Sequence, residues 1–409
     1  MLTLNLTARF TRSLLSLLMV LLLCFPGALL QAEEKEEAKV NPWIIVSQET
    51  TFFTKPLLPN GHVDYLTAIN KRKKEKIKGF VPEKNGAIYL VKATGSKEGG
   101  PIHFNNLLKA MGVNKKGKGI LAFPINKAPR LVHFREYLDL QIAMKNKKEI
   151  RLDSKQQLMK DFNNTEYGKP WKKADAPHIW AWVQMNEKPL KLVATGTEQP
   201  FFYLPYAWST KDKKPNMLME VLLPVAQESQ TFARLFAKRA MLHLGENRPA
   251  EAAKDLMIIH KLARQIGNRG TLIEGLVGIV IERIALNGDR QLAQHPQFSS
   301  QQLKEYTKKV QSLPAVTNSK EALNILERSS SLDSVQHLSV SSEDDETGGI
   351  FGKDFPFRQY LLMLFINWNL VLEEFNLHYD DIYLINQMPP RQRKVLLEKK
   401  RLQLLQEGK

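Results

Sequence analysis

The sequence predicts an all-α fold, an irregular array of antiparallel helical hairpins with little or no β structure. One observation behind this is that residues 231–289 read as three helices joined by two short turns. A second is that apolar residues elsewhere, such as Ala87, Leu90 and Val91, recur at steps of one, three or four residues, as expected for one face of a helix. We also expect helices over 130–144, 154–162, 176–185 and 189–195.

The first two helices of the central region have clear start and stop signals. We expect them over 233–244 and 250–266, because Gly245 follows the first and Pro249 opens the second. The apolar residues of the second helix form a single stripe: Ala252, Leu256, Ile259, Ala263 and Ile266. The small residues and the turn of the two helices resemble one tetratricopeptide-type hairpin. No second copy follows at a period of about 34 residues, so two packed helices without peptide binding are the favoured interpretation, and peptide binding is the alternative.

The third helix is expected to be the central helix of the fold. Thr271 has the side chain of an N-cap residue. The apolar residues that follow cover more than one stripe: Ile273, Leu276, Val277, Val280, Ile281 and Ile284. We therefore expect this helix to be buried on most of its circumference.

The first 32 residues have the layout of a secretory signal peptide. A basic start with Arg9 and Arg12 precedes the apolar run 14–25, and the small residue Ala32 marks a cleavage site. We therefore expect an exported protein, periplasmic or extracellular. An uncleaved membrane anchor is the alternative, although the apolar run is short for a bilayer span. Leu23, which precedes Cys24, argues against a lipoprotein.

Cysteine content and charge limit the classes of function. Cys24 is the only cysteine, so an exported chain that has lost its signal peptide has no disulfide and no thiolate chemistry. The net charge of +17 falls to +15 when Arg9 and Arg12 are removed. The lysine runs fall mostly in turns and at helix ends, without interleaved aromatic residues. We therefore expect solvated surface and no specific nucleic-acid partner.

The chain is expected to divide into six regions. These are the signal peptide (1–32), a tether with a short extended segment (33–54), an N-terminal helical region (55–200), a central helical core (201–328), a flexible loop (329–354) and C-terminal helices (355–409). The loop is predicted from its serine, glycine and acidic content. Its acidic cluster, 343–346, lacks the spacing of a calcium site. A single helical body with a small N-terminal subregion is favoured over two domains.

Several blocks of sequence carry a resemblance to a known family. They are KPLLPNGHVDYLTAIN with VPEKNGAIYLVKATG, KPWKKADAPHIWAWVQMNEKPLKLV with QPFFYLP, the long block from LLPVAQESQ to GIVIERIA, and NWNLVLEEFNLHYDDI. In this order the blocks resemble a family of exported proteins of unknown function from planctomycete-type bacteria. The resemblance implies an exported, mainly helical protein, and it implies no activity, cofactor or catalytic residue.

One polar constellation is a candidate site. His260 and Arg264 lie one turn apart on the second central helix, and Glu274 and Glu282 flank Gly278 on the third. Antiparallel packing would place Arg264 and Glu274 at similar height. One interpretation is a ligand pocket beside Gly278 with an acid or base at hand. The favoured interpretation is an ion pair across the hairpin, with the glycine allowing close helix packing.

Three classes of function remain, because no nucleophile, metal, phosphate or dinucleotide motif is present. The favoured hypothesis is a noncatalytic scaffold that binds a protein or peptide, with Phe201, Tyr203, Tyr206 and Trp208 as its aromatic surface. The first alternative is an enzyme of unrecognised type with a polar pocket near Gly278. The second is a binder of polyanions or of the envelope surface through the lysine runs. No cofactor or metal is expected, and contact with a membrane is expected only through an uncleaved signal segment.

Overall fold

The computed structural model describes residues 43–95, 100–114, 117–122, 130–145, 165, 168–208, 217–221, 223–317, 319–339, 366–389, 391–396 and 398. These residues form helices joined by turns. Their only β pairing consists of isolated bridges, for example between Leu57 and Val63. The all-α prediction is therefore confirmed for the described residues. The expected signal peptide, the expected helix at 154–162 and the acidic cluster at 343–346 lie outside them.

The chain divides into two compact units. One unit comprises Met1–Lys71, Pro215–Glu220 and Lys320–Lys409, and the other comprises Arg72–Lys214 and Val221–Ser319. This division differs from the predicted series of regions, because most of the expected N-terminal helical region and most of the central core belong to one unit. No helix among the described residues is long and apolar enough to cross a bilayer.

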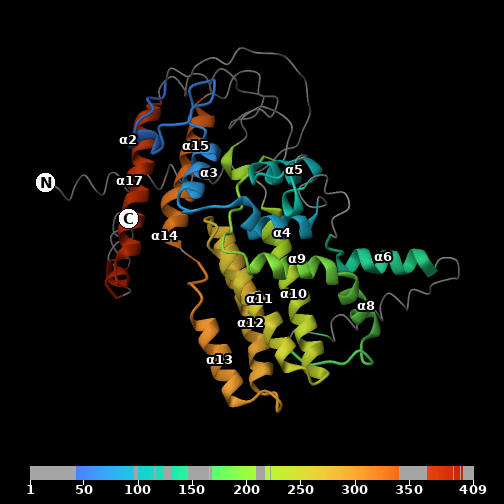
Figure 1. The fold of residues 1–409 in the computed structure, drawn as a ribbon. Helices are drawn as coiled ribbons and strands as arrows, with labels where there is room; N and C mark the ends of the chain where they lie inside the picture. The colour runs from blue at the N-terminus through green and yellow to red at the C-terminus, as the bar shows by residue number, and fades with distance from the viewer. Residues whose placement is uncertain are drawn as a thin grey trace. The chain divides into compact units, whose positions relative to one another are not determined.

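The unit of residues 72–214 and 221–319, which we call the central unit, contains most of the long helices. They are α4 (Gly86–Thr94), α5 (Gly100–Ala110), α6 (Phe134–Lys145), α8 (Pro177–Met185), α9 (Glu187–Thr197), α10 (Pro224–Gly245), α11 (Pro249–Gly267), α12 (Leu272–Ala293) and α13 (Ser300–Gln311). Helices α10, α11 and α12 lie side by side as consecutive antiparallel neighbours (Figure 1).

The predicted caps set most of the bounds of these three helices, and the start of α10 is the exception. Helix α10 begins at Pro224, earlier than expected, and α11 spans Pro249–Gly267, within one residue of the prediction. Before α12, the Thr271 hydroxyl accepts from the backbone N–H of Glu274, and the Glu274 carboxylate accepts from the N–H of Thr271. This capping box satisfies two of the amide donors that a helix start leaves without an intrahelical partner.

Helix α12 is not buried on most of its circumference, and that prediction is wrong. Its buried face carries small residues, including Gly275, Gly278 and Gly288, while Ile273 and Leu276 are 61% and 64% exposed. A Cβ on Gly278 would lie 2.5 Å from the Cα of Gly267 in α11. Gly278 lets the backbones of α11 and α12 approach, and Val277 and Ile281 pack inward beside it, while Ile273 and Leu276 remain on the outer face.

The N-terminal part of the central unit packs in the same way. Helices α4 and α9 contact each other, and a Cβ on Gly196 of α9 would lie 2.8 Å from the carbonyl oxygen of Gly86 in α4. Asn85, which caps α4, is fully buried. Its Oδ1 accepts from the N–H of Tyr203, and its Nδ2 donates to the carbonyl oxygen of Tyr203, both at 2.8 Å. One side chain thus holds the 201–208 segment against α4.

The other unit joins the two ends of the described chain. Helix α17 (Trp368–Gln387) contacts α2 (Gln48–Thr51), α15 (Arg328–Leu338) and the π-helical turn η4 (Ala322–Glu327). Nδ2 of the buried Asn376 in α17 donates to the carbonyl oxygens of Glu49 and Thr50 at 2.7 and 2.8 Å. The remaining elements are α3 (Tyr65–Glu75), which runs into the central unit, α14 (Ser319–Glu321) and η3 (Leu218–Glu220).

Two predictions for this unit are wrong. Residues 329–338, expected to lie in a loop, belong to α15, because Leu332 and Val335 are buried and outweigh the polar composition of the segment. The Ser334 hydroxyl finds a partner within the helix, because it donates to the carbonyl oxygen of Ser330 at 2.8 Å. The Ser331 hydroxyl lies 2.9 Å from that of Tyr379 in α17. Part of the expected extended segment is the helical turn α2, which the side chain of Ser47 caps.

Candidate functional site

The structure divides the predicted polar constellation into two groups of residues. His260 and Arg264 of α11 meet Glu282 of α12, whereas Glu274 lies in a separate cluster at the start of α12. The expected pairing of Arg264 with Glu274 is therefore wrong. Helical rise put the two residues at similar height, but the Glu274 side chain faces a different set of partners.

The first group is a continuous chain of charged contacts, which we call the His260 network. His260 is fully buried, with Nδ1 2.9 Å from Oε2 of Glu282 and Nε2 2.9 Å from Oδ2 of Asp289. Arg264 donates to the same oxygen of Glu282. The Tyr306 hydroxyl of α13 donates to Oδ1 of Asp289 at 2.6 Å. The network thus links α11, α12 and α13.

The surroundings of His260 favour its protonated form. Burial opposes the charge, but hydrogen bonds to Asp289 and Glu282, together with their negative charges, raise the pKa of His260 above its usual value. Burial likewise opposes the charge of Glu282, yet His260 and Arg264 lower the pKa of this carboxyl group. An imidazolium that donates from both ring nitrogens matches a carboxylate on each side.

Polar contacts hold α13 at its middle and just beyond its C-terminal end. In the middle of the helix, Tyr306 is tied through Asp289 to α12. Beyond its end, Nε of Arg264 donates to the carbonyl oxygen of Pro314 at 3.2 Å, and Asn268 donates to that of Ala315 at 2.7 Å. These polar contacts position α13 against the α11–α12 hairpin.

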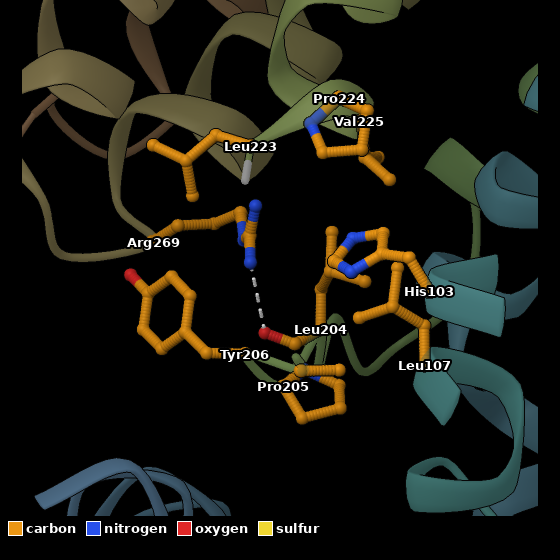
Figure 2. Close-up of a pocket in the computed structure, with 10 residues that line it drawn as sticks. His103, Leu107, Leu204, Pro205, Tyr206, Leu223, Pro224, Val225 and Arg269 are labelled. Atoms are coloured by element: carbon orange, nitrogen blue, oxygen red, sulfur yellow. Dashed lines mark hydrogen bonds between the residues drawn. The ribbon is translucent and has the colours of Figure 1, made fainter. Parts of the chain in front are cut away.

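The second group surrounds the start of α12, and Figure 2 shows two of its members, Arg269 and Tyr206. Arg269 forms an ion pair with the fully buried Glu274, and it donates to the carbonyl oxygen of Leu204 at 3.2 Å. The Tyr206 hydroxyl donates to Oε2 of Glu274 at 2.7 Å, and Lys73 donates to that hydroxyl at 3.2 Å. Glu274 therefore fixes the 203–207 segment to α12 instead of standing in an open pocket.

A small cavity of about 10 Å³ lies beside this group, between Arg269 and His103 of α5. This volume suits about one water molecule. Nδ1 of His103 and Nε of Arg269 have no hydrogen-bond partner among the described residues. Burial lowers the pKa of His103. Hydrogen bonds to the backbone of Trp208 and Ala207 raise this pKa, but by less than burial lowers it. The cavity is too small for a substrate.

The space beside Gly278 is filled. Besides its close approach to Gly267, a Cβ on Gly278 would lie 2.8 Å from the carbonyl oxygen of Ala263. The polar pocket considered for an enzyme therefore has no room at this position. The glycine instead accounts for the short distance between α11 and α12.

The aromatic segment does not provide the exposed surface expected for partner binding. Tyr203 is 6% exposed and Tyr206 is 4% exposed, while Phe201 and Trp208 are half-buried. The ring of Phe80 contacts Tyr203 edge-on, with centroids 5.5 Å apart. The carbonyl oxygen of Trp208 accepts from Asn106 of α5 at 3.2 Å. These aromatic residues join the N-terminal helices of the central unit to its core.

A larger opening, which the sequence did not predict, lies between α9, α11 and α13. This groove has a volume of about 590 Å³. Ala253 and Met257 of α11, Phe298 and the ring of Tyr306 contribute apolar surface, and Lys254 contributes charge. Further polar side chains come from the other helices: Thr195 and Glu198 of α9, and Gln302, Glu305 and Lys309 of α13. The volume lies in the range of ligand-binding clefts, about 300–1,000 Å³.

The groove shares a residue with the His260 network. Tyr306 lines the groove with its ring, while its hydroxyl is bound to Asp289. Burial and the charge of Asp289 raise the pKa of Tyr306, so this side chain stays protonated. The periodicity of α11 predicted that one face packs inward, but only the fold reveals that α13 leaves part of the other face open.

Within the described part of the chain, no cluster of three or more histidine, cysteine, aspartate or glutamate residues could hold a metal ion. Comparisons of this chain with protein-family models, with characterised proteins and with solved structures find no match. The resemblance to exported planctomycete proteins therefore stays a prediction, and the function has to be argued from the geometry of the site.

Proposed function

We propose that this chain is a noncatalytic, exported scaffold that binds a segment of another protein in the groove between α9, α11 and α13. The observation that carries this proposal is the groove itself, with a volume of about 590 Å³, an apolar floor and a charged rim. Such a lining suits a segment with apolar side chains on one face and charged or polar side chains at its edges.

The floor has the side chains that docking requires. Ala250 and Ala253 leave room for a partner backbone, and Met257 adapts to different partner side chains. Phe298 supplies an aromatic contact. These residues come from α11 and from the chain just before α13, which the His260 network holds in place.

The charged rim provides direction and selectivity. Two oxygens of Glu198 each accept from Lys261 at 2.7 Å, so the charge of Glu198 is already balanced. Lys254 on α11 and Lys309 on α13 make no ion pair with a described residue. Both can pair with carboxylates of the partner, while Glu305 accepts from Gln301 and limits how acidic the partner can be.

The same side chains favour binding over catalysis. The most perturbed groups near the groove are satisfied within the protein, as Tyr306 is by Asp289 and His260 by two carboxylates. The groove therefore offers contacts for a bound segment, but it does not place a nucleophile within hydrogen-bond distance of a base.

The test is site-specific photocrosslinking with the full-length protein in its native cell envelope. A photoreactive residue at Gln302, inside the groove, should crosslink to a partner, and the same residue at exposed Ala110 of α5 should not. The crosslinked segment is then made as a peptide and titrated by calorimetry. Ala253→Trp, which fills the groove, should weaken its binding at least tenfold, whereas Ala110→Trp should not. Equal binding by both variants, or no crosslink at Gln302, would refute the proposal.

A further inference from the structure

The outer face of α12 has an unusual composition for a water-exposed helix. Its exposed apolar residues, with exposed fractions from 38% to 64%, are Leu272, Ile273, Leu276, Ile279, Val280 and Leu286. They recur at helical spacing along one side of α12. Contiguous apolar surface of this kind marks a contact site for a protein or a membrane.

The buried face of the same helix combines small residues with large apolar ones. Gly275, Gly278, Ala285 and Gly288 face the interior, and Gly278 lies directly against the backbone of α11. Of the ten large apolar residues of α12, four are buried with these small residues and six are exposed, which is a large exposed share for one helix. Helices surrounded by lipid use this arrangement, because small residues permit close helix packing and large apolar residues meet acyl chains.

The charged residues on this face indicate the charge of its partner. Arg283 and Arg290 are exposed, lie one heptad apart on the apolar side, and form no ion pair with a described residue. The acidic residues of α12 are elsewhere: Glu274 is fully buried, and Glu282 and Asp289 belong to the His260 network. The face is thus apolar and cationic, without a carboxylate.

We propose that the outer face of α12 lies flat on an anionic lipid surface. The apolar residues of its first turns enter the boundary between headgroups and acyl chains, and Arg283 and Arg290 pair with lipid phosphates. A second copy of this chain is a poorer occupant, because it would bring the same two arginines and no carboxylate. A peptide is also poorer, because neither of the two cavities described above has a lining residue from α12.

This inference does not depend on the proposed function of the groove. Its sequence signal is the apolar run in 272–286, which by its hydropathy was expected to be buried. The +17 net charge of the chain adds long-range attraction to an anionic surface, but only the α12 face adds apolar contact to that attraction.

The experiment is co-sedimentation of the full-length protein with vesicles of phosphatidylglycerol and phosphatidylcholine, and with vesicles of phosphatidylcholine alone. Binding should require phosphatidylglycerol. Leu276→Glu should lower the partition coefficient at least tenfold, and Arg283→Glu should lower it and weaken its dependence on salt. The matched control is Leu377→Glu, because Leu377 on α17 is 48% exposed; it should bind as the wild type does. Circular dichroism checks that each variant is folded.

Three results would overturn the inference. The first is that the wild-type protein does not sediment with anionic vesicles at low salt. The second is that Leu276→Glu sediments as well as the wild type, because binding would then come from the net positive charge of the chain alone. The third is that light scattering detects a dimer that Leu276→Glu dissociates. Ala253→Trp should bind vesicles normally, so failure of the groove proposal can be told apart from failure of this one.

Discussion

Replacing His260 by glutamine should destabilise the central unit, and it should do so more at low pH than at high pH. The wild-type imidazolium makes two hydrogen bonds to carboxylates, each 2.9 Å long, from a fully buried position. A hydrogen bond to a charged group contributes about 1.5–3 kcal/mol. Glu282 and Asp289 are 14% and 21% exposed and keep Arg264 and Tyr306 as partners. We therefore expect each of the two hydrogen bonds to contribute near the lower end of this range, so that the substitution lowers the free energy of unfolding by about 3 kcal/mol.

The pH dependence follows from the direction of the pKa shift. Hydrogen bonds and negative charges from Asp289 and Glu282 outweigh burial and raise the pKa of His260 in the folded protein. Its stabilising contribution is therefore complete below the unfolded value, about 6.5, and is lost as pH rises through the folded pKa. The difference in stability between the wild type and His260→Gln should be larger at pH 6 than at pH 9.

The assay is thermal unfolding of the full-length proteins, followed by far-ultraviolet circular dichroism at pH 6 and pH 9. At pH 6 a loss of about 3 kcal/mol corresponds to a decrease of about 6–12 °C in the Tm of a domain of this size class. His178→Gln on α8, where the histidine is half-buried, is the matched control and should leave the Tm unchanged. A decrease in Tm below about 2 °C at pH 6, or equal decreases at both pH values, would refute the charged-network reasoning.

Three further substitutions test other contacts. Gly278→Ala places a Cβ 2.5 Å from the Cα of a glycine in α11, so overpacking should cost about 1–3 kcal/mol in urea denaturation; an unchanged midpoint would contradict the close packing. Tyr306→Phe removes the donor to Asp289 and should speed amide hydrogen exchange in α13 while leaving that of α10 unchanged; uniform exchange in both helices would argue against a local clamp. Asn85→Ala breaks two 2.8 Å hydrogen bonds to the backbone of Tyr203 and should expose 201–208 to limited proteolysis, and a protease-resistant variant would show that the segment is held by other contacts.

Local signals in the sequence predicted the helices of the central region well. Pro249 and Gly267 bound α11, and Thr271 with Glu274 caps α12, because capping depends on residues within one turn. Which face of α12 is buried could not be read in this way. Val277 and Ile281 are as apolar as Ile273 and Leu276, so hydropathy does not choose between the two faces. Gly278 marks the buried face only through its contact with the backbone of α11, which the sequence does not show.

The candidate site was predicted in part. His260 and Arg264 are one turn apart on a helix, and their contact with each other follows from spacing. Their partner Glu282 depends on the rotation of α12 about its axis, which helical rise alone does not give. The contribution of Tyr306 needs the position of α13, and the groove needs three helices from distant parts of the chain.

The contact between α2 and α17 has a consequence for how the chain is made. Asn376 binds the backbone of Glu49 and Thr50 across more than 300 residues, whereas the α10–α11–α12 contacts are between neighbours along the chain. During synthesis the central unit can therefore complete its native contacts while the ribosome still holds the C-terminal segment. The other unit has to wait for α17, and its closure should be the slower folding step.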